Sequence, residues 1–113
     1  MTSQEKVTFG EYIRELRTNH NLTLTQLAAK LDLDSANLSK IENGKRDFDE
    51  KRLVKLAQVF KLNIKELQQE YISDQIAKKI YECNCTKEML VVAEEKAKYR
   101  RQLSNQYRKE KVL

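Results

Sequence analysis

The 113-residue sequence contains no proline, only two glycines and no tryptophan. Hairpins and sandwiches need frequent chain-reversing residues, so this scarcity argues against a β-fold. The chain also lacks an apolar run near the ~20 residues that cross a bilayer, and its polar N-terminus lacks the apolar core of a signal peptide. These absences predict an all-α protein located in the cytoplasm and not in a membrane.

Cysteine and histidine are also scarce, with Cys83 and Cys85 the only cysteines and His20 the only histidine. Two cysteines one residue apart suit neither an easy mutual disulfide nor a complete metal site. We interpret them as reduced thiols without a structural role, and redox sensing is the alternative. The sequence shows no catalytic triad and no metal cluster, which predicts that the protein is not an enzyme and needs no cofactor.

Charge is abundant, and its sign is uneven along the chain. The formal net charge is +5, with 12 Lys and Arg against 11 Asp and Glu through Glu70, and 10 against 6 beyond it. A basic excess favours a polyanionic partner. Two interpretations of the basic tail stay open, a solvated helix end or an arm that binds phosphates. The tail contains Lys96, Lys98, Arg100, Arg101, Arg108, Lys109 and Lys111.

Apolar residues recur at helical spacing in five segments of residues 1–71. The segments lie at about 9–19, 24–31, 35–43, 50–60 and 64–71. Each follows a side chain that can cap a helix, namely Thr8, Thr23, Asp34, Asp49 and Asn63. We therefore expect residues 1–71 to form one compact domain of five helices.

Residues 72–113 are expected to form a two-helix extension. One helix is predicted at about 74–82, with Ser73 as its cap, and a longer one from Thr86 to about Arg108. Their apolar stripe either packs back on the domain or serves self-association, and we favour a dimer interface. The residues assigned to that interface are Ile76, Ile80, Met89, Val92, Leu103 and Tyr107.

Residues 22–46 have the spacing of two short helices joined by a tight turn. An inner apolar set consists of Leu27, Ala28, Leu31, Leu33, Leu38 and Ile41. The outward set on the second helix consists of Ser35, Ala36, Asn37, Ser39 and Lys40. This is the helix-turn-helix arrangement, whose second helix projects its N-terminal side chains at base edges in DNA. The alternative is an ordinary solvated face.

The stretch from Leu38 to Arg46, LSKIENGKR, resembles the lambda repressor and Cro-like helix-turn-helix family, often called XRE-type regulators. The resemblance covers about residues 8–71 and implies a five-helix lambda repressor-like DNA-binding domain. It implies a major-groove surface formed by Ser35, Ala36, Asn37 and Lys40. It implies sugar-phosphate contacts from Asn43, Lys45 and Arg46, and a buried ion pair between Arg17 and Glu42.

One position departs from the family pattern. The second helix opens with Leu24, where relatives commonly have a glutamine that contacts phosphate. Thr23, Thr25 and Gln26 are the candidates to replace that contact, through a hydroxyl, an amide or backbone N–H groups.

The resemblance implies a transcriptional regulator that binds a palindromic operator in double-stranded DNA as a homodimer. It would act as a repressor or as an autoregulating controller, such as those that accompany restriction-modification genes. The alternative function is an antitoxin-like module whose extension binds a partner protein, a toxin, while its fold also binds DNA.

Overall fold

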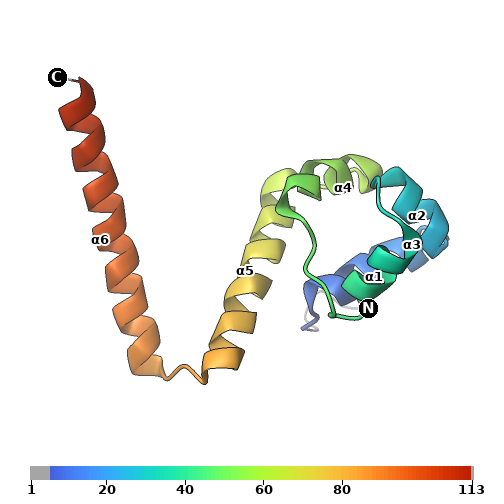
Figure 1. Cartoon of the computed structure of the whole chain (residues 1–113), viewed down its shortest axis with the longest axis horizontal. Helices are drawn as coiled ribbons and strands as arrows, with labels where there is room; N and C mark the ends of the chain where they lie inside the picture. Colours follow the sequence, from blue (N-terminus) through green and yellow to red (C-terminus); the bar gives the residue numbers. More distant parts are fainter. Residues whose placement is uncertain (1–5, 113) are drawn as a thin grey trace. The chain divides into compact units, whose positions relative to one another are not determined.

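The computed structural model describes residues 6–112, with side chains described as far as Arg108. All regular structure in this range is helical, which confirms the all-α prediction (Figure 1). The contacts divide the chain into an N-terminal unit up to Ile76 and a C-terminal unit from Ala77. The elements are α1 (Phe9–Asn19), α2 (Leu24–Lys30), α3 (Ser35–Glu42), the 3-10 turn η1 (Glu50–Arg52), α4 (Leu53–Phe60), α5 (Ile64–Cys83) and α6 (Lys87–Val112).

Side-chain caps set the starts of the first three helices. At α1, the Thr8 hydroxyl accepts from the Glu11 backbone N–H at 3.2 Å, and the Glu11 carboxylate accepts from the Thr8 backbone N–H at 2.9 Å. This bond from the Thr8 backbone lowers the pKa of the Glu11 carboxyl. Thr23 and Gln26 form the same capping box at α2, and Asp34 caps α3. These starts agree with the predicted ones.

Residues with positive φ stand where the predicted helices stop. Asn21 has φ 56°, Gly44 has φ 75° and Asn84 has φ 51°. The backbone N–H groups of Gly44 and Lys45 donate to the last turn of α3 at 3.1 and 2.8 Å. These bonds satisfy carbonyls that have no partner inside the helix. The chain therefore leaves α3 in a defined direction.

The core of the N-terminal unit draws side chains from α1 to α5. Its buried apolar residues are Phe9, Ile13, Leu27, Ala28, Leu31, Leu38, Ile41, Phe48, Leu53, Leu56, Ala57, Phe60, Leu67 and Tyr71. Leu33, expected in the inner set, is partly buried and packs against this cluster from the α2–α3 turn. Because α2 and α3 both bury one face here, their outer faces remain available to solvent.

The predicted fifth and sixth helices are one continuous helix. α5 runs from Ile64 to Cys83, so the predicted interruption between residues 71 and 74 is wrong. The Ser73 hydroxyl does not start a helix but donates to the Glu70 carbonyl at 3.2 Å, inside α5. No glycine or proline lies in this segment, so the backbone has no reason to leave the helical conformation. The boundary expected after Tyr71 falls within this helix.

The predicted fourth helix begins in a different form. Its first three residues make the 3-10 turn η1, with Asp49 accepting from the Lys51 backbone N–H at 3.0 Å. From this turn, the Arg52 guanidinium donates to the carbonyls of Leu31 and Asp32 at 3.1 and 3.3 Å. Lys55 of α4 also pairs with Asp32 and lowers the pKa of its carboxyl. The start of α4 therefore holds the α2–α3 turn in place.

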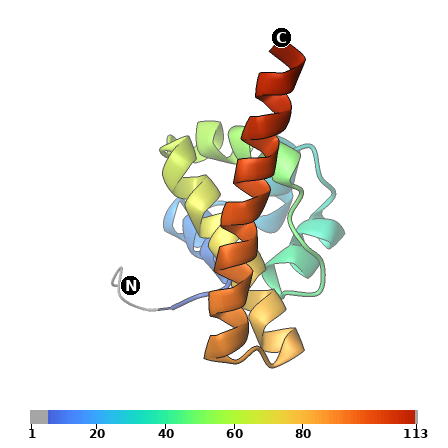
Figure 2. The same ribbon diagram turned by 90° about the vertical axis from the view of Figure 1, so that its left-hand side faces the viewer.

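The C-terminal unit contains the end of α5 and all of α6, which Figure 2 draws as one uninterrupted helix in orange to red. The Thr86 hydroxyl caps α6 by accepting from the Met89 backbone N–H at 3.2 Å. The helix continues beyond its predicted end near Arg108. Among the side chains described in α6, none is fully buried. Within residues 6–112, no helix is both long and apolar enough to cross a membrane.

Gly10 permits a close approach of α1 to the end of α3. A Cβ at this position would lie 2.2 Å from the Ile41 carbonyl oxygen and 2.9 Å from that of Glu42. Gly10→Ala should lower the free energy of unfolding by about 2 kcal/mol, although alanine favours helices, because backbone atoms cannot swing aside. Urea unfolding followed by circular dichroism measures this change.

Gln58→Ala, on the exposed face of α4, is the control and should change stability by less than about 0.5 kcal/mol. If the Gly10 variant is as stable as this control, the close contact between the two backbones is contradicted.

Candidate nucleic-acid interface

The helices α2 and α3 pack against each other through buried apolar side chains and meet at a tight turn. The Leu33 backbone N–H donates to the Ala28 carbonyl at 2.9 Å, and Asp32 takes a positive φ of 55° in this turn. The outer face of α3 stays polar. On it, Ser35, Ala36 and Lys40 are exposed, while Asn37 and Ser39 are partly buried.

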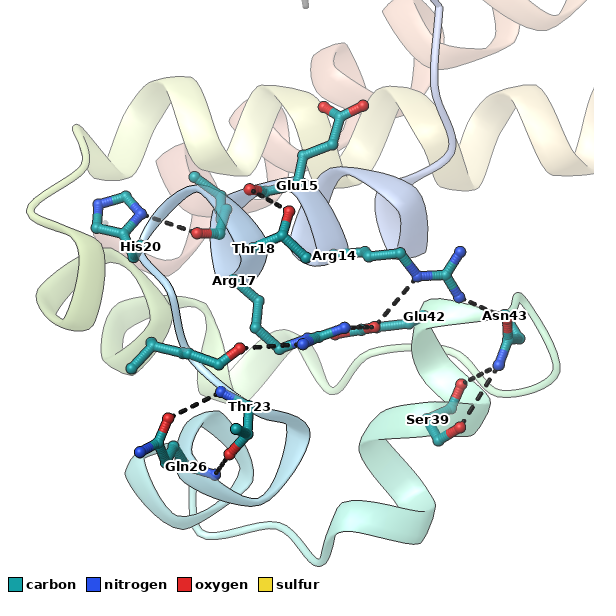
Figure 3. A network of polar contacts seen from close by, with 12 residues as sticks. Arg14, Glu15, Arg17, Thr18, His20, Thr23, Gln26, Ser39, Glu42 and Asn43 are labelled. Carbon is teal, nitrogen blue, oxygen red and sulfur yellow. Dashed lines mark hydrogen bonds and ion pairs between the residues drawn. The ribbon is translucent and has the colours of Figure 1, made fainter.

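The end of α3 is fixed by a buried carboxylate. Glu42 is only 2% exposed, yet both of its oxygens are paired. Arg17 of α1 donates through Nε to Oε2 at 2.8 Å and through Nη2 to Oε1 at 3.1 Å, and Arg14 donates to Oε1 at 3.3 Å (Figure 3). A buried charge is tolerated when it is paired and fully hydrogen-bonded, and this arrangement meets both conditions.

Arg17 has a third contact that reaches the start of α2. Its Nη1 donates to the Leu22 carbonyl at 3.0 Å, and its side chain is only 15% exposed. One guanidinium therefore joins α1, the end of α3 and the loop that leads into α2. This side chain therefore ties both the end of α3 and the entry into α2 to α1.

Asn43, expected on the sugar-phosphate backbone, is bonded within the protein. Arg14 donates to its side-chain oxygen, and its amide N–H groups donate to the Ser39 carbonyl and hydroxyl at 2.9 and 3.5 Å (Figure 3). Sequence reasoning missed Arg14. Its position three residues before Arg17 on the same helix was the available signal, since residues at that spacing share a face.

Two of the three candidates for the missing glutamine contact pair with each other. The Thr23 hydroxyl accepts from the Gln26 backbone N–H at 3.1 Å, and the Gln26 amide oxygen accepts from the Thr23 backbone N–H at 2.8 Å (Figure 3). Their side chains therefore shape the N-terminus of α2. Thr25 lies exposed in the first turn of that helix.

Asn37 is held from two sides. Its backbone and side-chain N–H groups donate to the two carboxylate oxygens of Asp34 at 2.7 and 3.0 Å. Its side-chain oxygen accepts from Nη1 of Arg46. The structure thus brings together two residues to which the sequence assigned different roles, and it adds Asp34, which was expected only as a cap. Lys40 and Lys45 are exposed nearby in the chain.

The apolar residues assigned to a dimer interface lie on α5 and α6. Ile80 is partly buried. Ile76, Met89, Val92, Leu103 and Tyr107 are exposed. The thiol residues Cys83 and Cys85 are free, and the part of the chain that the structure describes has no group of three His, Cys, Asp or Glu residues able to hold a metal ion.

Comparisons with known proteins match the N-terminal unit. Residues 13–67 match the helix-turn-helix family model. The chain is 45% identical over 60 residues to the HTH-type transcriptional regulator RghRB of Bacillus subtilis (strain 168), covering 52% of this chain and 43% of the relative. It is 42% identical over 55 residues to the HTH-type transcriptional repressor RghR of the same organism, covering 48% and 41%. The chain spans less than half the length of these curated relatives.

Solved structures that the chain matches include the restriction-modification controller protein C.AhdI from Aeromonas hydrophila. It is 34% identical, with 52% of this chain and 89% of that chain covered and a TM-score of 0.47. A transcriptional regulator from Listeria innocua is 22% identical, with 85% and 94% covered and a TM-score of 0.49.

Residues 13–67 form a helix-turn-helix domain of the lambda repressor-like, or XRE, type, as the sequence predicted. Both curated relatives are named as HTH-type transcriptional regulators, the class of protein that the sequence predicted.

Arg17 is the main partner of Glu42. Arg17→Ala should lower the free energy of unfolding by about 3 kcal/mol, because it leaves a buried carboxylate with a single, weaker partner. Arg14→Ala is the matched comparison. Arg14 is 43% exposed, so its removal should cost about 1 kcal/mol or less. Urea unfolding of both variants measures the difference, and equal losses would contradict the dominant role of Arg17.

Proposed function

We propose that the chain is a sequence-specific DNA-binding transcriptional regulator that reads its operator with α3. The observation that carries the proposal is the paired, buried Glu42, which fixes the end of α3 while Ser35, Ala36 and Lys40 on the outer face of the helix stay exposed. A rigidly held helix with small polar residues in its first turn suits entry into the major groove. The 42% identity to RghR, which is named a repressor, favours repression.

The exposed residues divide by chemistry. Ser35 and Ala36 have small side chains, which permit close approach to the bases, and Lys40 can donate to guanine. Lys45, in the loop after α3, carries a charge suited to a phosphate, and the first turn of α2 offers backbone N–H groups to another. Because its target is chromosomal or plasmid DNA, we place the protein in the cytoplasm.

We further infer that two chains bind together on a palindromic operator through their C-terminal extensions. Exposed apolar side chains on α6, Met89, Val92 and Leu103 among them, support this inference. A helix whose apolar residues stay in water gains little stability from packing, so a second copy that covers them is favoured. A palindromic operator requires the two α3 helices to lie about 34 Å apart, one turn of DNA.

Selection of bound duplexes from a random pool, with the full chain, tests the DNA proposal. The wild type should return a palindromic motif. Lys40→Ala should relax one position per half-site by about 10-fold. Lys45→Ala should weaken all sequences alike and reduce the salt slope by about 1 per subunit.

Lys65→Ala is the control for charge removal, because Lys65 is exposed on α5, outside the motif. It should leave both the motif and the salt slope unchanged. If Lys40→Ala selects the wild-type motif and Lys45→Ala keeps the wild-type salt slope, α3 and its following loop are not the reading surface.

Two neighbouring valines provide a test of the dimer proposal and its matched control. Val92 is 47% exposed within the apolar stripe, and Val91 is 56% exposed but lies about 100° away around the helix. Val92→Glu should weaken self-association at least about 10-fold, because a charge would be buried in the interface. Val91→Glu should leave it nearly intact.

Sedimentation equilibrium at micromolar concentration measures both variants. A wild-type chain that is monomeric alone and on its operator would refute dimerisation and would leave the extension open for a different protein partner.

A further inference from the structure

The loop after α3 places a guanidinium at the reading end of that helix. Arg46 is exposed and lies four residues beyond α3, yet its Nη1 donates to the side chain of Asn37 in the first turn of α3. In a helix-turn-helix domain, the first turn of the second helix approaches the base edges. The Arg46 guanidinium therefore lies beside the first turn of α3, the part of the helix that would approach the base edges.

A chain of hydrogen bonds keeps the guanidinium there. Asn37 bonds to Arg46 through its amide oxygen and to Asp34 through its amide nitrogen, and Asp34 is itself fixed as the cap of α3. The loop is also anchored beyond Arg46. Phe48 is buried and its carbonyl accepts from the Tyr71 hydroxyl at 2.9 Å. A side chain held in this way loses less conformational entropy when it binds.

The bonds also decide which residue can read a base. Asparagine recognises adenine by using its amide oxygen and nitrogen together, and in Asn37 both atoms already have partners. The guanidinium of Arg46 has five N–H donors, and the bond to Asn37 leaves its Nε–Nη2 edge unengaged by that residue. Two parallel N–H donors match the O6 and N7 acceptors of guanine.

We propose that Arg46 reads a guanine in the major groove, and that Asn37 and Asp34 are positioning residues that hold it in place. The proposal rests on the DNA-binding function proposed above and names a base that it recognises. It gives the base contact to Arg46, which the resemblance placed on the sugar-phosphate backbone, and gives Asn37 a positioning role in place of a direct contact in the major groove. The negative charge of the Asp34 carboxylate, one side chain away, also repels a phosphate at this point. A neutral base edge is not repelled in this way.

The test is selection of bound DNA, followed by affinity measurements on operators changed at single positions, for the wild type and three variants. Arg46→Lys keeps the charge but loses the planar two-donor edge. Asp34→Asn keeps a capping residue but replaces one accepting oxygen with a donor. Asn37→Ala removes the link. Circular dichroism verifies that each variant is folded.

We expect a guanine at one position of each half-site and a loss of about 10-fold in its preference in Arg46→Lys, with the salt slope unchanged. Asn37→Ala and Asp34→Asn should relax that same position. Unchanged base preferences in Arg46→Lys would overturn the proposal, and so would a relaxed A·T position in Asn37→Ala. A wild type that selects no motif would instead refute the proposed DNA-binding function itself.

Discussion

The pairing of one buried carboxylate with two arginines governs the geometry of the N-terminal unit. Burial of the Glu42 carboxylate depends mainly on Arg17, with Arg14 as a second, more exposed partner, and both guanidinium groups come from α1. The carbonyl of the same residue lies against Gly10, so side chain and backbone together fix the end of α3 against α1. Because Arg17 also holds the Leu22 carbonyl, the entry into α2 is set by the same group. This polar contact thus fixes α3 and the entry into α2 against α1, while packing of the apolar core leaves the outer face of α3 exposed.

The loop that follows α3 is anchored at both ends and carries Arg46 on the exposed surface. Its beginning is bonded to the last turn of α3 through Gly44 and Lys45. Its end is buried at Phe48, whose ring packs against Phe9 and whose carbonyl accepts a hydrogen bond from the Tyr71 hydroxyl. Only a few residues lie between these two anchors, and Arg46 is one of them. These anchors and the bond to Asn37 restrict the conformations of Arg46, and such restriction favours discrimination between bases.

Local signals in the sequence predicted local structure well. Thr8, Thr23 and Asp34 mark helix starts because each cap involves residues only three apart. The continuity of α5 was missed because Ser73 is equally compatible with a cap and with a helix interior. The approach at Gly10 and the bond between Asn37 and Arg46 join residues distant in sequence or on different elements. Such contacts depend on how the helices and loops pack together, and the spacing of residues along the sequence does not predict that packing.

The most direct measurement is methylation interference on the selected operator with the full chain. Dimethyl sulfate methylates guanine at N7 in the major groove and adenine at N3 in the minor groove. If α3 and Arg46 read the major groove, methylation of one guanine per half-site should block binding by the wild type, and that interference should weaken in Arg46→Lys. Interference confined to adenines, or none at guanines, would contradict reading of the major groove by this surface.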